Sequence, residues 1–160
     1  MSVDIAVDPG ISGAGYVLMN KDMSYKFIVK AGVLNADNSL SWEEKAVDIA
    51  EQLFAVAKSY GGCRNMYCEF PIIYNNPGGI SIAVKGDILK LIYSVGVLAG
   101  VFKDSLFKAI KVNIWKGQLP KKAVEKRIIQ KLGAKTCTRL GLDSHSWDAV
   151  GIALYVRGDF

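Results

Sequence analysis

The sequence has 160 residues, of which 51% are hydrophobic, and a formal net charge of +5. This length fits a single domain, residues 1–160, with a sizeable buried core. We expect no secretory signal, because no basic, apolar and small-residue leader opens the sequence. The most apolar run, residues 91–102, is too short to cross a bilayer and predicts a buried helix instead.

The three cysteines, Cys63, Cys68 and Cys137, are odd in number and show no CxxC spacing. This pattern favours reduced thiols over a disulfide or a zinc site. We therefore expect a cytoplasmic protein.

Basic residues gather in one part of the chain. Residues 103–139 contain eleven lysines and arginines against two acidic residues, a net charge of +9, whereas the remaining residues carry a net charge of −4. A solvated helix face accounts for some of this enrichment. Its one-sidedness favours a polyanionic partner, and nucleic acid is the partner we expect.

The beginning of the chain predicts a buried strand, a tight glycine turn and a second strand running back. Apolar residues alternate with polar or small ones over residues 3–8, so this pattern delivers Asp8 at the end of the strand. Pro9-Gly10 breaks the strand, and Gly13 and Gly15 let the backbone come close to whatever Asp8 holds. A carboxylate placed in this way suits a metal ion or a phosphate group.

The following elements predict an antiparallel meander and then a helix. Strands are expected at about residues 14–20 and 25–34, and together with the first strand they form the meander. Ser41 and Glu44 make a capping box at the start of a helix, which ends at Gly61-Gly62.

The second half of the chain alternates strands and helices. A short strand over residues 65–70 is stopped by Pro71 and presents Glu69 at its end, as the first strand presents Asp8. The remaining predicted elements are a long apolar helix over about 80–102, a strand near 109–114, a basic helix from Pro120 to Gly133, and a last helix that starts near Asp143-Ser144. This order predicts an α/β fold with a five-stranded mixed sheet, an antiparallel meander plus parallel strands, flanked by helices.

The last helix carries two further candidate site residues. His145 is the only histidine of the sequence and lies three positions before Asp148, so the two side chains share a helix face. We expect both in the first turn, where the helix dipole favours Asp148. The spacing leaves His145 open between a ligand and a structural residue. Asp143 lies off that face and is more easily interpreted as an N-cap.

Four motifs in sequence order carry a resemblance to a nuclease family. They are Asp8-Pro9-Gly10 with its glycine turn, Cys68-Glu69, Val112-Asn-Ile-Trp-Lys-Gly-Gln118, and His145-Ser-Trp-Asp148. Together they resemble the RuvC family of Holliday junction resolvases, in the ribonuclease H-like nuclease superfamily, over essentially the whole chain. The chain departs from the cellular form in the 71–79 loop and in the long helix, and it therefore resembles a phage-type or otherwise divergent member.

The resemblance implies a metal-dependent DNA endonuclease that acts on four-way and related branched DNA in recombination and repair. The family has an acidic tetrad whose third member is aspartate or histidine, and this chain resembles the histidine version. The implied catalytic and metal-binding residues are Asp8, Glu69, His145 and Asp148. Such ligands suit two Mg²⁺ ions, or Mn²⁺, and His145 would be a ligand or a general base. Cleavage would leave 5′-phosphate and 3′-hydroxyl ends.

Contacts with branched DNA are expected beside the third motif and in the loop after Glu69. Tyr74 in that loop would stack on unpaired bases. Basic side chains would hold phosphates, with a solvated helix face as the alternative; they are Lys116, Lys121, Lys122, Lys126 and Arg127. Because a resolvase cuts two symmetric strands, we expect a homodimer. The interface would be the long helix with Gly96 and Gly100, unless these glycines pack against a neighbouring helix of the same chain.

Three other interpretations remain. Actin-like ATPases and sugar kinases also begin with an aspartate and a glycine turn, but they need a second domain and a second such turn, for which 160 residues leave no room. Another ribonuclease H-like nuclease, acting on flaps or RNA–DNA hybrids, would share the tetrad. A non-catalytic junction-binding module would have no reason to keep all four site positions. If the protein is phage-encoded, we expect it in the host cytoplasm.

Overall fold

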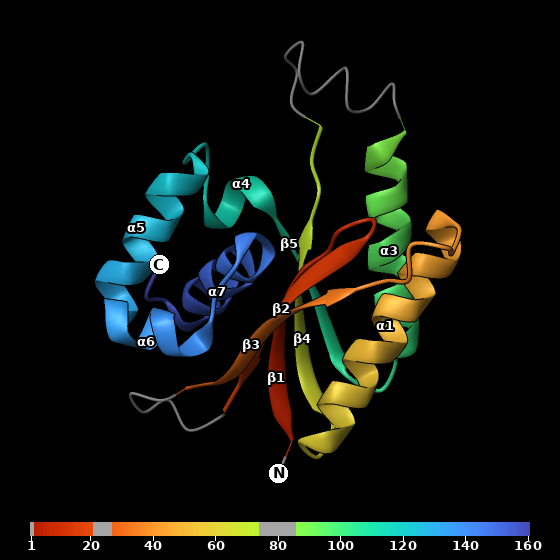
Figure 1. The fold of residues 1–160 in the computed structure, drawn as a ribbon, viewed down its shortest axis with the longest axis horizontal. Coiled ribbons are helices and arrows are strands. Elements are labelled where there is room, and N and C mark those ends of the chain that lie inside the picture. Colours follow the sequence, from red (N-terminus) through yellow and green to blue (C-terminus); the bar gives the residue numbers. More distant parts are fainter. Residues whose placement is uncertain (1, 21–26, 74–85) are drawn as a thin grey trace.

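The chain folds into a five-stranded mixed sheet with helices on both faces (Figure 1). The computed structural model describes residues 2–20, 27–73 and 86–160. The strands, in the spatial order β3-β2-β1-β4-β5, are β1 (Val3–Asp8), β2 (Gly13–Met19), β3 (Ile28–Asn35), β4 (Cys63–Phe70) and β5 (Leu106–Lys111). The first three strands pair in antiparallel fashion, whereas β1, β4 and β5 run parallel. The predicted fold class, including the antiparallel meander, is therefore confirmed.

Helices form a layer on each side of this sheet (Figure 1). They are α1 (Trp42–Ser59), α3 (Asp87–Val101), α4 (Val112–Trp115), α5 (Lys121–Leu132), α6 (Ala134–Leu140) and α7 (Ser144–Arg157). α1 and α3 cover one face, and α7 covers the other, with α5 and α6 outside it (Figure 1). No helix within the described ranges is long and apolar enough to cross a membrane.

The strands separate two hydrophobic cores. On β1, Ile5 and Val7 belong to the core that contains Leu53 of α1 and Leu98 of α3. Ala6 belongs to the other core, built around α7. Because side chains alternate along a strand, the central strand is buried on both faces, and odd and even positions point into different cores.

Three predicted helix boundaries are confirmed. α1 follows the capping box, in which Ser41 accepts from the Glu44 backbone N–H at 3.3 Å and donates its own backbone N–H to the Glu44 carboxylate at 2.8 Å. α5 begins directly after Pro120 and ends at Gly133. α7 begins after Asp143, which accepts from the Ser146 backbone N–H at 3.2 Å and is thus the N-cap.

The predicted strand near residues 109–114 is wrong in its second half. β5 ends at Lys111, and the short helix α4 follows directly. This turn carries Trp115 into the core, where its indole ring packs against Gly151 of α7 and is 3% exposed. Burial of that large ring outweighs the strand preference of the preceding β-branched residues.

Other elements agree with expectation only in part. The long apolar helix is seen as α3, Asp87–Val101, and residues 80–85 of the predicted helix lie outside the described part. The helix α6 was not expected; it is separated from α5 by Gly133, whose φ of 81° a glycine adopts without strain. The three cysteines are free thiols, as predicted.

Candidate active site

Two carboxylates end neighbouring strands on the same face of the sheet. β1 and β4 run parallel, with Val7 opposite Cys68, so that Asp8 and Glu69 follow side by side. Val7 and Cys68 both point into the core under α1 and α3. The next residue of each strand therefore points to the α7 face. This register explains why Asp8 and Glu69 meet although 61 positions separate them.

The helix α7 supplies the other two candidate residues. His145 lies at the beginning of this helix, and its Nδ1 is 3.4 Å from Oδ2 of Asp8. Asp148 lies at the start of the second turn, so the expectation that it belongs to the first turn is wrong. The predicted tetrad nevertheless comes together at one end of the sheet. Asp143, the other acidic residue near the start of α7, caps the helix instead.

Gly15 explains how α7 comes so close to Asp8. Gly15 is paired with Asp8 across β1 and β2. A Cβ at Gly15 would overlap the backbone carbonyl of His145 and lie 2.8 Å from the backbone nitrogen of Ser146. The start of α7 thus rests directly on the glycine backbone. The glycines were predicted to leave room for whatever Asp8 holds, which stays a prediction; the backbone that comes close to Gly15 in the structure is that of α7.

The environment of Asp8 favours a nearby cation. Asp8 is 8% exposed, and burial raises the pKa of its carboxyl group. The hydrogen bond with His145 lowers this pKa, whereas the charge of Asp148 raises it further. The pKa of His145 is raised in turn, first by its hydrogen bond to Asp8. Because the His145 side chain is half exposed, it compensates the Asp8 charge only in part.

Glu69 is likewise in an environment that disfavours its ionised form. Burial and then the charge of Asp8 raise the pKa of its carboxyl group from 4.5 to about 7. Two neighbours oppose this rise: the ammonium group of Lys116 and a hydrogen bond of 2.7 Å from the indole Nε1–H of Trp115 to Oε2 of Glu69. Trp115 is thus a positioning residue for Glu69. It was not among the predicted site residues, because the strand predicted over residues 109–114 gave no sign that α4 would turn its ring toward Glu69.

Lys116 lies among the carboxylates. Its Nζ is 3.0 Å from Oδ2 of Asp148 and 3.7 Å from Oε2 of Glu69. The side chain is only 18% exposed. Burial lowers the pKa of this ammonium group, but Glu69 and Asp148 raise it by more, so it stays charged. The structure therefore places Lys116 inside the acidic site, whereas the sequence had grouped it with the exposed phosphate contacts.

The donor set has the chemistry of a divalent-cation site. Three carboxylates and one imidazole lie near one another at this edge of the sheet, and burial raises the pKa of Asp8 and Glu69, so a bound cation would stabilise their ionised forms. Hard oxygen donors of this kind suit Mg²⁺ or Mn²⁺. Among the described residues, however, no group of three or more His, Cys, Asp or Glu side chains is arranged so that it could hold a metal ion. The ammonium of Lys116 lies between two of the carboxylates instead.

The helix α5 carries the other basic candidates on its exposed side. Lys121, Lys122 and Lys126 are exposed, and Lys121 is close enough to His145 to lower its pKa. The guanidinium group of Arg127 is exposed but lies over the ring of Phe160, 5.1 Å from its centroid. Tyr74 lies outside the described residues. The basic helix thus begins beside the acidic site.

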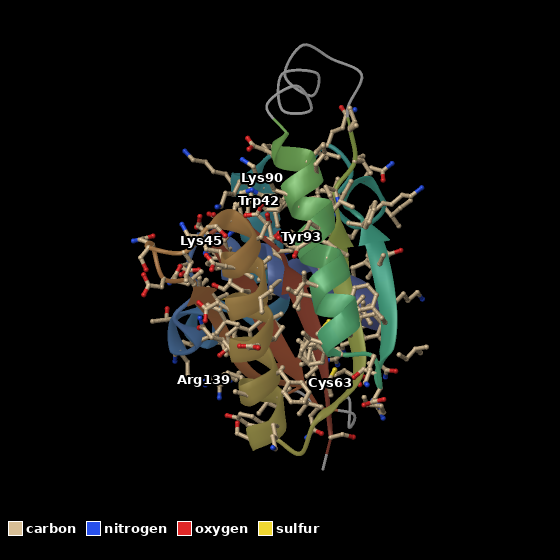
Figure 2. The ribbon with its side chains drawn as sticks, turned by 90° about the vertical axis from the view of Figure 1, so that its right-hand side faces the viewer. Trp42, Lys45, Cys63, Lys90, Tyr93 and Arg139 are labelled. Carbon is tan, nitrogen blue, oxygen red and sulfur yellow. The ribbon has the colours of Figure 1, made fainter. Side chains whose placement is uncertain are left out.

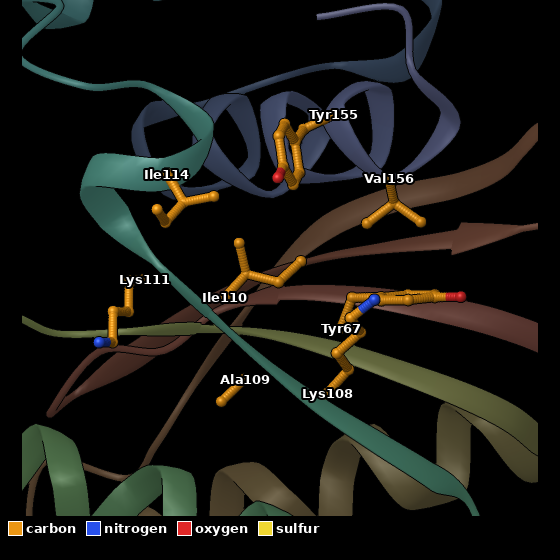
Figure 3. Close-up of a pocket in the computed structure, with 8 residues that line it drawn as sticks. All are labelled: Tyr67, Lys108, Ala109, Ile110, Lys111, Ile114, Tyr155 and Val156. Atoms are coloured by element: carbon orange, nitrogen blue, oxygen red, sulfur yellow. The ribbon is translucent and has the colours of Figure 1, made fainter.

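A cavity of about 690 Å³ is lined by residues of β4, β5, α4 and α7 (Figure 3). Its lining includes Ile110 of β5, Ile114 of α4, and Tyr155 and Val156 of α7, which face one another across it (Figure 3). None of the tetrad residues contributes to its wall.

Comparisons with known proteins identify the fold. No protein-family model matches this sequence, and no curated protein matches it. Among solved structures, T. thermophilus RuvC in complex with Holliday junction substrate is 19% identical, with a TM-score of 0.71 over 99% of this chain and 96% of that chain. A second Thermus thermophilus RuvC structure is 18% identical, with a TM-score of 0.69 over 98% of this chain and 96% of that chain. The fowlpox virus Holliday junction resolvase is 14% identical, with a TM-score of 0.56 over 98% of this chain and 97% of that chain. The chain thus has the fold of RuvC-like resolvases, as its motifs suggested.

Proposed function

From this fold and its acidic site, we propose that the protein is a structure-selective DNA endonuclease that resolves four-way and related branched junctions by metal-dependent phosphodiester hydrolysis. The observation that carries the proposal is the meeting of Asp8 and Glu69 on adjacent strand ends with His145 and Asp148 of α7. Junction resolvases supply the solved structures that share the fold over nearly the whole chain.

The carboxylates serve as metal ligands in this proposal. Asp8, the most buried of them, would hold divalent ions together with Glu69 and Asp148, and the ions would be Mg²⁺, two per site, or Mn²⁺. Bound ions of this kind activate a water molecule and stabilise the charge that develops on the phosphate. The raised pKa values of Asp8 and Glu69 support this assignment, because carboxylates that repel one another gain most from a bound cation. Hydrolysis would leave 5′-phosphate and 3′-hydroxyl ends.

We assign proton transfer to His145. Its Nδ1 faces Asp8, so the other ring nitrogen, Nε2, is the atom available to a water molecule on the exposed side. The carboxylate of Asp8 fixes the orientation of the ring in the manner of other Asp–His pairs. In this arrangement His145 accepts the proton of the attacking water, rather than serving first as a metal ligand.

The basic side of α5 fits the phosphates of the branched substrate. Lys121, Lys122 and Lys126 project from a helix that begins next to His145, so their charges lie along one path from the site. Phosphate contacts of this kind position a duplex without reading its sequence. Arg127 would contribute from the same helix after leaving the ring of Phe160.

We further propose a two-fold dimer through α3. Leu89, Ile92 and Tyr93 are large apolar residues at 67%, 40% and 41% exposure on this helix. Gly96 and Gly100 continue the exposed side of the helix, and among the described residues no atom comes within 4 Å of a Cβ built on either glycine. These glycines therefore do not serve close packing against the described part of this chain. Figure 2 shows Tyr93 beside Trp42 of α1 on this face.

A comparison of substrates tests the proposed function. Equal concentrations of a four-way junction, a flap, an RNA–DNA hybrid and a plain duplex are incubated with the protein and Mg²⁺, with EDTA as the control. We expect preferred cutting of the junction in symmetric strands, with nicks that DNA ligase reseals. Preference for the flap or the hybrid would assign a different nuclease activity, and junction binding without any cutting would indicate a binding module.

A further inference from the structure

Lys116 differs from the exposed lysines of α5, because its partly buried ammonium group lies beside the carboxylates of Glu69 and Asp148. It directly follows Trp115 at the end of α4, and its ammonium group lies 4.7 Å from the centroid of the Trp115 ring. From there Nζ reaches Asp148 on α7 at 3.0 Å and Glu69 on β4 at 3.7 Å. One side chain therefore joins three elements of the site: α4, α7 and β4.

The charges around Lys116 are unbalanced without it. Asp8, Glu69 and Asp148 each raise the pKa of the Lys116 ammonium, so all three carboxylates act on this one cation. Lys116 in turn lowers the pKa of Asp8 and of Glu69. In a partly buried site such mutual effects are strong, because water screens the charges poorly. The ammonium is thus the cation that holds the carboxylates together in this structure.

Divalent ions held by Glu69 and by Asp148 would need the same carboxylate oxygens that Lys116 now contacts. An ammonium group 3.0 Å from Oδ2 of Asp148 lies where a ligated cation would compete for that atom. Lysine is suited to such an exchange, since its flexible stem allows a compact charge to move without disturbing the backbone.

We propose that Lys116 is a built-in counter-cation of the acidic site, which neutralises Glu69 and Asp148 in the metal-free protein and is displaced when divalent ions bind. The inference rests on the proposed function, because it assumes that these carboxylates are the metal ligands. It goes beyond that function in making metal affinity a competition with a side chain of the same chain. Lys116 is accordingly a positioning residue that lowers the affinity of the acidic site for divalent ions.

The experiment measures metal binding and metal-free stability, and it needs no nuclease assay. Mg²⁺ and Mn²⁺ are titrated calorimetrically into the wild-type protein and Lys116→Met, which keeps a long unbranched side chain without the charge. We expect Lys116→Met to bind Mg²⁺ more tightly, by on the order of tenfold, because no ammonium has to leave. Lys116→Arg retains the positive charge and should not show the gain.

Thermal unfolding supplies the second readout. In EDTA, Lys116→Met should unfold at a lower temperature than the wild type, and saturating Mg²⁺ should restore more stability to the variant than to the wild type. Lys131→Met removes an equally positive but exposed charge from the end of α5 and serves as the matched control, with unchanged metal affinity.

The outcomes separate this inference from the proposed function. Unchanged or weaker Mg²⁺ affinity in Lys116→Met, with circular dichroism showing a folded variant, would overturn it, as would an equal loss of stability with and without metal. The latter result would make Lys116 a structural ion-pair partner only. Metal binding by neither protein would also refute it. Mg²⁺-dependent junction cutting by the wild type would leave the nuclease proposal standing in the first two cases, whereas the lack of metal binding by the wild type would count against that proposal as well.

Discussion

The indole Nε1–H of Trp115 donates a hydrogen bond of 2.7 Å to Oε2 of Glu69, and the two residues are 46 positions apart. Trp115 is itself fixed by close packing against Gly151 of α7, where a Cβ would overlap its ring. Glu69 is therefore held by a side chain that belongs to the second core. The stability of that core and the geometry of the site depend on one another.

Even with this hydrogen bond, the pKa of Glu69 lies at about 7 instead of 4.5. An acid whose pKa is raised by folding contributes its full stability below pH 4.5 and loses it as the pH rises through about 7. We predict that Glu69→Gln, in EDTA, loses less stability between pH 5 and pH 8 than the wild type. The difference at pH 8 amounts to at most about 3 kcal/mol.

Urea unfolding at both pH values measures this effect. Glu43→Gln, at an exposed position in the first turn of α1, is a control for which no difference is expected. Parallel pH profiles for Glu69→Gln and the wild type would show that the carboxyl group of Glu69 is not strained by its surroundings.

His145 offers a direct view of the site, because it is the only histidine in the sequence. Its hydrogen bond to Asp8 raises its pKa above 6.5. Stability from this pair is fully present below pH 6.5 and is lost as the pH rises through the raised value. We predict that NMR titration of the metal-free protein gives one imidazole with an elevated pKa, and that Asp8→Asn lowers it.

A matched variant makes this titration specific. Asp143 also raises the pKa of His145, but its contribution is smaller than that of Asp8, so Asp143→Asn should lower the value by less than Asp8→Asn. An equal effect of the two substitutions would mean that the Asp8–His145 hydrogen bond is not the main cause.

The exposed side of α3 should carry the dimer. We predict that Leu89→Glu converts a dimer into a monomer, because a charge would be buried in an apolar interface. Sedimentation velocity measures the change. Leu106→Glu on β5 is the matched control, since Leu106 is 70% exposed and Leu89 is 67% exposed. A monomeric wild type, or a dimer that survives Leu89→Glu, would contradict this interface.

The basic side of α5 should determine how DNA binding depends on salt. We predict that the triple alanine variant of Lys121, Lys122 and Lys126 reduces the slope of log affinity against log salt by about 2 to 3, roughly 0.9 for each lost phosphate contact. Fluorescence anisotropy with a labelled junction and no divalent metal measures this slope. Lys58→Ala, in the last turn of α1, removes an exposed charge from the other side of the sheet and should leave the slope unchanged. An unchanged slope in the triple variant would exclude α5 as the phosphate contact.

Much of the site could be predicted because it follows from local rules. Alternation along β1 and β4 places Asp8 and Glu69 at strand ends, and parallel pairing then brings them together. The capping residue Asp143 and the three-residue spacing of His145 and Asp148 fix the rest of the tetrad on α7. Each of these signals lies within a few residues of the side chain that it positions.

The parts that escaped prediction depend on contacts distant in sequence. Trp115 and Lys116 entered the site because α4 turns the chain after Lys111, and that turn is stabilised by burial of Trp115 against α7. Nothing in the local pattern distinguishes this turn from a continuing strand. The partner of Gly15, the start of α7, likewise became visible only in three dimensions. The side chains that support the carboxylates are thus harder to predict from the sequence than the carboxylates themselves.

The most direct test of the central claim is junction cleavage by Asp8→Asn in the presence of Mg²⁺. This variant keeps the size of the side chain and removes the charge from the most buried carboxylate of the site. Circular dichroism and junction binding confirm that the variant is folded and competent to bind. We predict cleavage reduced by at least about a thousandfold, because the stabilisation of the transition state depends on metal ions that the Asp8 carboxylate would help to hold. Cleavage by the folded Asp8→Asn variant at the rate of the wild type would contradict the assignment of this acidic site as the nuclease centre.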